Sequence, residues 1–134
     1  MSKQFKPQTH ITLVQNTVNA AHQDLDAVKE LVEAEPTLVN AVCDRGAGDW
    51  ELALGGASHM VKKEIAEYLL SKGARMDVFC AAMLGKKRIL EAMIEDDPAI
   101  VHAKGPHGIP LLAHAKRSGD DSVVQLLIDH GAEA

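Results

Sequence analysis

Hydrophobic residues recur along most of this chain at the three- and four-residue spacing of an amphipathic α-helix. Leu25, Val28, Leu31 and Val32 form one such stripe, and Pro36 ends it because proline cannot continue the helical hydrogen-bond ladder. The same pattern predicts four helix pairs with a short turn inside each pair: residues 11–22 and 25–34, 50–59 and 62–72, 78–84 and 87–95, and 110–118 and 122–129. No β-strand is needed to account for this pattern.

Internal repeats support the pairing. The ending Leu-Leu followed by Gly-Ala occurs at residues 69–74 and again at residues 126–132. Residues 27–39 match residues 89–101 at a constant offset of 62. Repetition of a short helix pair predicts a solenoid, in which each unit packs on its neighbours and the surface serves for contacts.

Composition fits one small helical domain. The chain has 134 residues, of which 46% are apolar and only 3% aromatic, so its core must consist of Ala, Leu, Val, Ile and Met. A sandwich or barrel is not expected with so few aromatic side chains.

Charge and hydropathy limit the partners and the compartment. The net charge of -5 is opposite in sign to that of a typical nucleic-acid-binding domain, so no nucleic-acid partner is expected. No apolar stretch reaches the length of a membrane span, and the first eight residues lack the apolar segment of a signal peptide. Cys43 and Cys80 are too few and too far apart for a disulfide framework. We therefore expect a monomeric cytoplasmic protein with no membrane partner.

The chain resembles an ankyrin-repeat protein over roughly residues 10–134. Repeats of this family have about 33 residues and contain an inner helix, a glycine turn and an outer helix that ends in Leu-Leu and Gly-Ala. The fourth unit carries the resemblance best, with Gly108-Ile109-Pro110-Leu111 at its opening, Gly119 at its turn and the ending at residues 123–132. The second unit keeps the ending but not the opening, since Leu52-Ala53-Leu54-Gly55 lacks the proline and histidine of the family's Thr-Pro-Leu-His.

This resemblance implies an all-α fold, an ankyrin-repeat solenoid of antiparallel helix pairs with short finger loops. A flexible segment, residues 1–8, would precede a single domain, residues 9–134, with units at about residues 9–41, 42–74, 75–103 and 104–134. The aligned turns fall at Gln23, Val61, Gly85 and Gly119, and the short interval before Gly85 predicts that the third unit lacks its finger loop. Val61 stands where the family usually has glycine, which predicts backbone strain or a different turn there.

The resemblance also implies a non-enzymatic module that binds a partner protein through its concave face and finger loops. Met60, Met83 and Leu84 could form an exposed patch for the partner, or they could pack in the core. Trp50, the only tryptophan, could anchor an interface or seal the first pair of repeats. The predicted partner-binding residues are Arg45, Trp50, His59, Met60, Met83, Leu84, His107 and Arg117.

Basic residues cluster at the turns inside the helix pairs, which stack on one another in a solenoid. They predict a basic ridge that attracts an acidic partner, or an edge that is simply solvated. The residues of this ridge are Lys62, Lys63, Lys86, Lys87, Arg88 and Lys116.

The sequence contains no established catalytic or metal-binding motif. Its seven histidines show no HExxH or similar spacing, and no phosphate loop or nucleophile elbow occurs. We therefore expect no enzyme activity, no cofactor and no metal. Two alternatives remain open: a small-ligand, metal-binding or enzymatic protein that uses Trp50 and the region His107–His114, and a purely structural scaffold.

Overall fold

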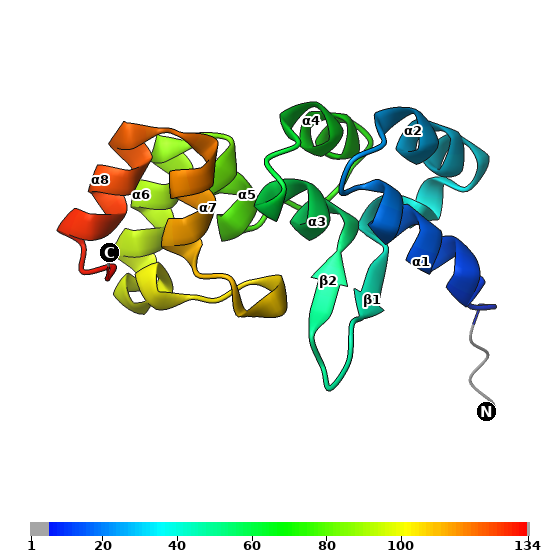
Figure 1. Cartoon of the computed structure of the whole chain (residues 1–134), viewed down its shortest axis with the longest axis horizontal. Helices are drawn as coiled ribbons and strands as arrows, with labels where there is room; N and C mark the ends of the chain where they lie inside the picture. Colours follow the sequence, from blue (N-terminus) through cyan, green and yellow to red (C-terminus); the bar gives the residue numbers. More distant parts are fainter. Residues whose placement is uncertain (1–5, 134) are drawn as a thin grey trace.

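The computed structural model describes residues 6–133, and this part of the protein is mostly helical (Figure 1). Residues 1–5 of the predicted flexible segment lie outside the described residues. The α-helices of the described part are α1 (Ile11–Ala20), α2 (Leu25–Ala34), α3 (Ala53–His59), α4 (Lys63–Ser71), α5 (Val78–Met83), α6 (Lys87–Asp96), α7 (Leu111–Ser118) and α8 (Asp121–Asp129). The remaining elements are the 3₁₀ helices η1 (Pro36–Asn40), η2 (Pro98–His102) and η3 (Pro106–Gly108), and the strands β1 (Val42–Asp44) and β2 (Trp50–Leu52).

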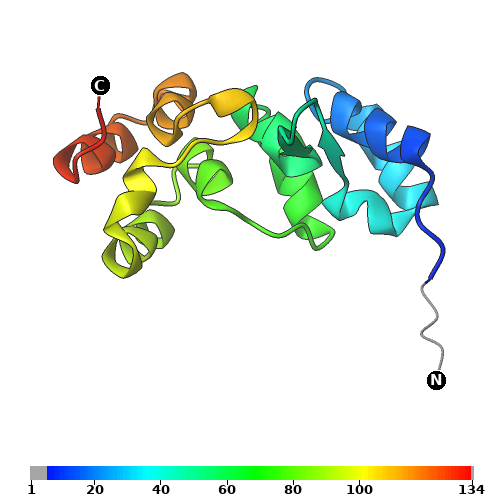
Figure 2. The same ribbon diagram turned by 90° about the horizontal axis from the view of Figure 1, so that it is seen from below.

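Consecutive helices pack together in pairs: α1 with α2, α3 with α4, α5 with α6, and α7 with α8. The first helices of neighbouring pairs also contact one another, α1 with α3, α3 with α5, and α5 with α7. Figures 1 and 2 show the resulting elongated molecule, with α1 and α2 toward one end and α7 and α8 toward the other. The β1–β2 hairpin projects from the row of helices (Figure 1).

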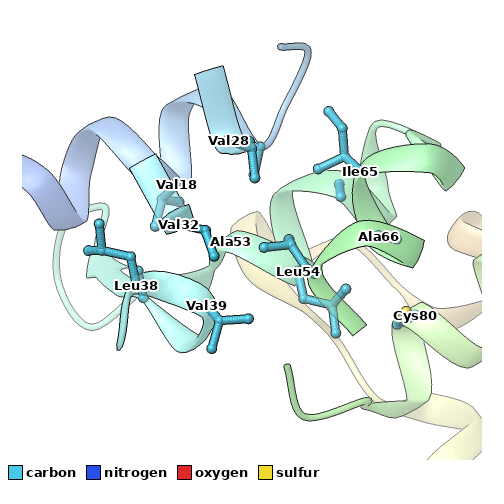
Figure 3. Close-up of a cluster of buried hydrophobic side chains, with 14 of the residues drawn as sticks. Val18, Val28, Val32, Leu38, Val39, Ala53, Leu54, Ile65, Ala66 and Cys80 are labelled. Carbon is cyan, nitrogen blue, oxygen red and sulfur yellow. The ribbon is translucent and has the colours of Figure 1, made fainter. Parts of the chain in front are cut away.

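Two clusters of buried aliphatic side chains hold the pairs together. The first combines residues of α1, α2, η1, α3 and α4 with Cys80 and Met83 of α5 (Figure 3). The second joins α5 and α6 to α7 and α8. Cys80 is completely buried in the first cluster, and this burial raises the pKa of its thiol to about 12.

Of the two interpretations of Met60, Met83 and Leu84, an exposed patch or packing in the core, the structure supports core packing for Met83 and excludes one continuous exposed patch. Met83 is completely buried, Leu84 is half-buried, and only Met60 is exposed. Met83 belongs to the first core cluster because α5 packs directly against α3 there.

The prediction that residues 50–59 form one helix is correct only from Ala53 onward. Residues 50–52 form strand β2, which pairs antiparallel with β1 in the register Val42 with Leu52, Cys43 with Glu51 and Asp44 with Trp50. Pairing satisfies the backbone hydrogen bonds of these residues and turns alternate side chains to opposite faces. Glu51 is therefore buried, whereas Trp50 is exposed.

The third helix pair has no loop comparable with the β1–β2 hairpin. Only residues 74–77, which form neither helix nor strand, join Gly73 to α5. Because no such loop lies between the second and third helix pairs, η3 packs directly against β2. Two loops that are far apart in sequence therefore lie side by side.

The turn of the second pair contains a strained residue, as the sequence predicts. Val61 has a φ of 56°, in the left-handed region that a β-branched residue rarely adopts. Gly85 and Gly119 have φ values of 71° and 77° at the corresponding turns, where glycine adopts this conformation without a steric penalty.

Candidate metal centre

Glu51 is a completely buried carboxylate surrounded by basic side chains. Its Oε2 atom lies 3.2 Å from His22 Nε2, 2.9 Å from His59 Nε2 and 3.0 Å from His107 Nε2. Its Oε1 atom accepts a hydrogen bond of 2.9 Å from Arg45 Nε. We call His22, Glu51, His59 and His107 the Glu51 cluster; one ligand atom from each residue lies within 4.8 Å of the others.

The hairpin places Glu51 because side chains alternate along a strand. Asp44 Oδ1 accepts hydrogen bonds from the backbone N–H groups of Gly46 and Gly48 and so closes the loop between β1 and β2. The paired residues Cys43 and Glu51 face inward, where both are buried. The hairpin thereby places the carboxylate of Glu51 in the interior, in contact with His59 of α3.

His22 and His59 come from the ends of two neighbouring inner helices. His22 follows α1 by two residues, and its Nδ1 atom donates a 2.8 Å hydrogen bond to the carbonyl oxygen of Val18. His59 is the last residue of α3. Because α1 packs against α3, the two rings meet edge to face with centroids 5.0 Å apart and Nε2 atoms 3.2 Å apart.

His107 reaches the cluster from η3. Asp49 holds it at two points: Oδ1 accepts from the His107 backbone N–H at 2.7 Å, and Oδ2 pairs with Nδ1 at 2.8 Å. His107 has a φ of 61°, a strained conformation for a non-glycine residue. Strain of this kind concentrates at functional sites, where the surrounding structure compensates for it.

Two glycines of α3 leave the space that these histidines need. A Cβ atom on Gly56 would lie 2.7 Å from His22 Cε1, too close for the ring to keep its position. A Cβ atom on Gly55 would lie 3.3 Å from Pro106 Cγ, next to His107. The small residues of α3 therefore leave room for the side chains of the Glu51 cluster as well as for the neighbouring helices.

The surroundings of Glu51 favour its ionised form despite its burial. Burial alone would raise the pKa of Glu51, but hydrogen bonds from His22 and His59 outweigh it and hold that pKa well below its usual range. The same hydrogen bond raises the pKa of His22 above its ordinary 6.5. A hydrogen bond from the backbone of His107 lowers the pKa of Asp49. The site is thus built around a negative charge that must be compensated by cations.

The hydrogen bonds at Nδ1 determine what the Nε2 atoms present to Glu51. The Val18 carbonyl and the Asp49 carboxylate can only accept hydrogen bonds, so Nδ1 of His22 and of His107 carries the hydrogen. In a neutral ring Nε2 then has a lone pair, and this lone pair faces Glu51 Oε2. Either a second proton on each ring or a shared cation must lie between them. Metal-binding histidines have this arrangement, with one nitrogen on the ion and the other on a carbonyl or carboxylate oxygen.

Four residues predicted to bind a partner lie in the Glu51 cluster or in contact with it: Arg45, His59, His107 and Arg117. His59 and His107 are members of the Glu51 cluster, and His59 is only 7% exposed. Arg45 forms an ion pair with Glu51. Arg117 Nη1 donates a 3.1 Å hydrogen bond to the backbone carbonyl oxygen of His59.

The remaining predicted surface residues are exposed. Trp50 is 60% exposed and Met60 45% exposed. All residues of the predicted basic ridge are also exposed: Lys62, Lys63, Lys86, Lys87, Arg88 and Lys116.

Within the region His107–His114, which the alternative interpretation singled out, His107 belongs to the Glu51 cluster and His114 does not. His114 is completely buried, and burial lowers its pKa. Its Nδ1 atom bonds to the Pro110 carbonyl oxygen, and its ring lies 4.9 Å from that of Phe79. The partners of His107 come instead from the first half of the chain.

The sequence interpretation missed Glu51 because its strand was assigned to a helix. One signal in the sequence could have found two of the histidines. His22 lies one residue before the turn at Gln23 and His59 two residues before the turn at Val61, so both are at nearly equivalent positions in successive helix pairs. No spacing rule links either of them to His107, which is 48 residues beyond His59.

No protein-family model matches this sequence, and neither does any curated protein. Within the described residues, every helix is too short or too polar to cross a membrane.

Proposed function

We propose that this protein binds one divalent first-row transition metal ion through His22, His59, His107 and Glu51, with Zn²⁺ as the first candidate. The observation that carries this proposal is the convergence of three imidazole Nε2 atoms on one buried carboxylate oxygen. Imidazole and carboxylate together suit Zn²⁺, and imidazole also suits Fe, Ni and Cu. The ion replaces the protons that would otherwise have to separate the Nε2 lone pairs from Glu51.

The spacing of the ligand atoms supports the proposal. Zinc–nitrogen bonds of about 2.0–2.1 Å place neighbouring ligand atoms about 3.3 Å apart in a tetrahedral site. The separations between Glu51 Oε2 and the three Nε2 atoms, and between Nε2 of His22 and of His59, are 2.9–3.2 Å. Small outward movements of these side chains would admit the ion.

We also propose that the four helix pairs are degenerate ankyrin repeats. The pairing of the helices, the left-handed turns within the second, third and fourth pairs and the loops that precede α3 and α7 support this assignment. In this arrangement the finger loops supply Glu51 and His107, and the ends of inner helices supply His22 and His59. A repeat scaffold thereby gathers ligands that are distant in sequence.

Isothermal titration of the chelator-treated 134-residue chain with Zn²⁺ tests the metal proposal. We expect one ion per chain. His59→Gln should weaken binding by more than about 100-fold, because even partners that only orient a ligand contribute 10- to 100-fold. His102→Gln is the matched control, since His102 is exposed and outside the cluster. Gly56→Ala should also weaken binding although it removes no ligand, because the added Cβ displaces His22.

Two results would contradict the proposal. One is the absence of saturable binding of Zn²⁺, Co²⁺ and Ni²⁺ by the folded protein. The other is an equal loss of affinity in His59→Gln and His102→Gln, which would show that exposed histidines bind the ion non-specifically.

A second function, binding of an acidic protein partner, is favoured by the basic ridge. Its six residues are exposed, and none forms a salt bridge within the described residues. We expect retention on immobilised poly-glutamate that falls as salt rises, because exposed charges are screened. Replacing Lys86, Lys87 and Arg88 by Glu should abolish retention. Unchanged retention of this variant would show that the basic ridge does not bind the acidic partner.

A further inference from the structure

We infer that the metal bound at the Glu51 cluster takes an oxyanion, a phosphate or carboxylate group, at a position open to solvent, with Arg45 and Arg117 beside it. This inference rests on the proposed metal function and names the ligand class of the same site. Three features of the site carry it: its one-sided exposure, its charge and the position of the two guanidinium groups.

The cluster is closed on one side and open on the other. The side chain of Glu51 is completely buried and that of His59 is 8% exposed, whereas those of His22 and His107 are 21% and 37% exposed. An ion held here would therefore contact protein on the Glu51 side and solvent between His22 and His107. Because four protein ligands already complete a tetrahedral site, the oxyanion would enter from this solvent side as a fifth ligand, an expansion that zinc sites can undergo.

The charges of the site are unbalanced once a divalent ion is bound. Glu51 and Asp49 each contribute one negative charge, and Arg45 and Arg117 each contribute one positive charge. These four charges cancel, so neutral histidines leave the two positive charges of the ion uncompensated. An anion at the open position would reduce this excess, whereas a neutral or cationic ligand would not.

Both arginines have nitrogen atoms available for an oxyanion. Arg45 uses Nε for Glu51, and its side chain is 25% exposed. Arg117 uses Nη1 for the backbone carbonyl of His59, and none of the salt bridges among the described residues involves it. A guanidinium group has five N–H donors, so each keeps several after these single bonds. Their planar arrangement matches phosphate and carboxylate groups.

The experiment uses the 134-residue chain loaded with Co²⁺, because the visible absorption of this ion changes when its ligands change. Inorganic phosphate and acetate are titrated separately, and acetamide serves as the uncharged counterpart of acetate. We expect a saturable spectral change with phosphate or acetate and none with acetamide. Whichever anion binds more tightly distinguishes a phosphate from a carboxylate ligand.

Variants then separate the anion from the metal. On protein saturated with Co²⁺, Arg117→Met should weaken anion binding about tenfold, the loss of one charge-assisted contact; Co²⁺ affinity is measured separately, because Arg117 also bonds to the backbone of the ligand His59. Arg117→Lys should restore part of the anion affinity because it restores the charge. Lys116→Met, a change at the neighbouring exposed cation, should have no effect. Urea unfolding of each variant shows that the loss does not come from a damaged fold.

The outcomes distinguish the two proposals. If Co²⁺ binds but neither anion alters its spectrum, the oxyanion inference is overturned and the metal proposal stands. If acetamide acts like acetate, or Arg117→Met leaves anion affinity unchanged, charge does not select the ligand and the inference also fails. If no Co²⁺ binds, both proposals fall.

Discussion

Replacing Glu51 by Gln should destabilise the metal-free protein by about 3 kcal/mol, close to the 3–5 kcal/mol expected when one partner of a buried ion pair is removed. Glu51 is completely buried and accepts hydrogen bonds on both oxygens. The amide group of Gln cannot accept at both positions, and it leaves Arg45 without its counter-charge. Urea unfolding of chelator-treated wild type and variant measures the difference.

The partial exposure of Arg45 and His107 places the expected loss at the lower end of that range, because solvent screens these two groups. Glu67→Gln is the matched control, since Glu67 is exposed on α4 and should change stability by less than about 0.5 kcal/mol. A loss in Glu51→Gln no larger than in this control would mean that the buried carboxylate does not organise the site.

Replacing Met83 by Ala should cost about 3 kcal/mol, within the range of 2–5 kcal/mol measured for large-to-small changes in protein cores. Met83 is completely buried in the first core cluster, where α5 packs against α3. Its truncation removes apolar contacts and leaves a cavity that neighbouring helices fill only partly. Thermal or urea unfolding measures the loss.

Met60→Ala gives the comparison at an exposed methionine of the same predicted patch. Met60 is 45% exposed, so we expect a change of about 0.5 kcal/mol or less. Similarly small effects of both substitutions would show that Met83 is not a core residue and would support the methionine patch as a binding site.

The proposed metal would connect segments that the fold already holds close together. His22 lies at the end of α1, Glu51 in β2, His59 at the end of α3 and His107 in η3. Val18, Arg45 and Asp49 fix the side chains of His22, Glu51 and His107, respectively, before any ion is present. Fixed ligands lose little freedom on binding, which favours affinity.

Helical periodicity predicted most of the secondary structure correctly. The second helix, α2, has the predicted bounds Leu25–Ala34, and α8 begins one residue before the predicted start. Local signals sufficed because proline, turn glycines and capping aspartates act over a few residues. Asp120, for example, accepts from the backbone N–H groups of Ser122 and Val123 and starts α8.

The strand at Trp50–Leu52 could not be predicted in this way. Its conformation depends on pairing with Val42–Asp44, across a loop that contains three glycine or alanine residues, Gly46, Ala47 and Gly48. An apolar residue on either side of Glu51 fits a helix and a strand equally well over so short a segment. Because residues 50–52 were assigned to a helix, the inward direction of the Glu51 side chain was not predicted, and this direction is the feature that forms the site.

By itself, the sequence determined the helix pairs, their turns and the strained turn at Val61, since each depends on neighbours within a few residues. Only the tertiary structure decided that Met83 is core and that His22, His59 and His107 meet at Glu51. The physical reason is that burial and convergence depend on how the pairs stack. The short connection before α5 lets η3 reach β2, and no local pattern in the sequence records that contact.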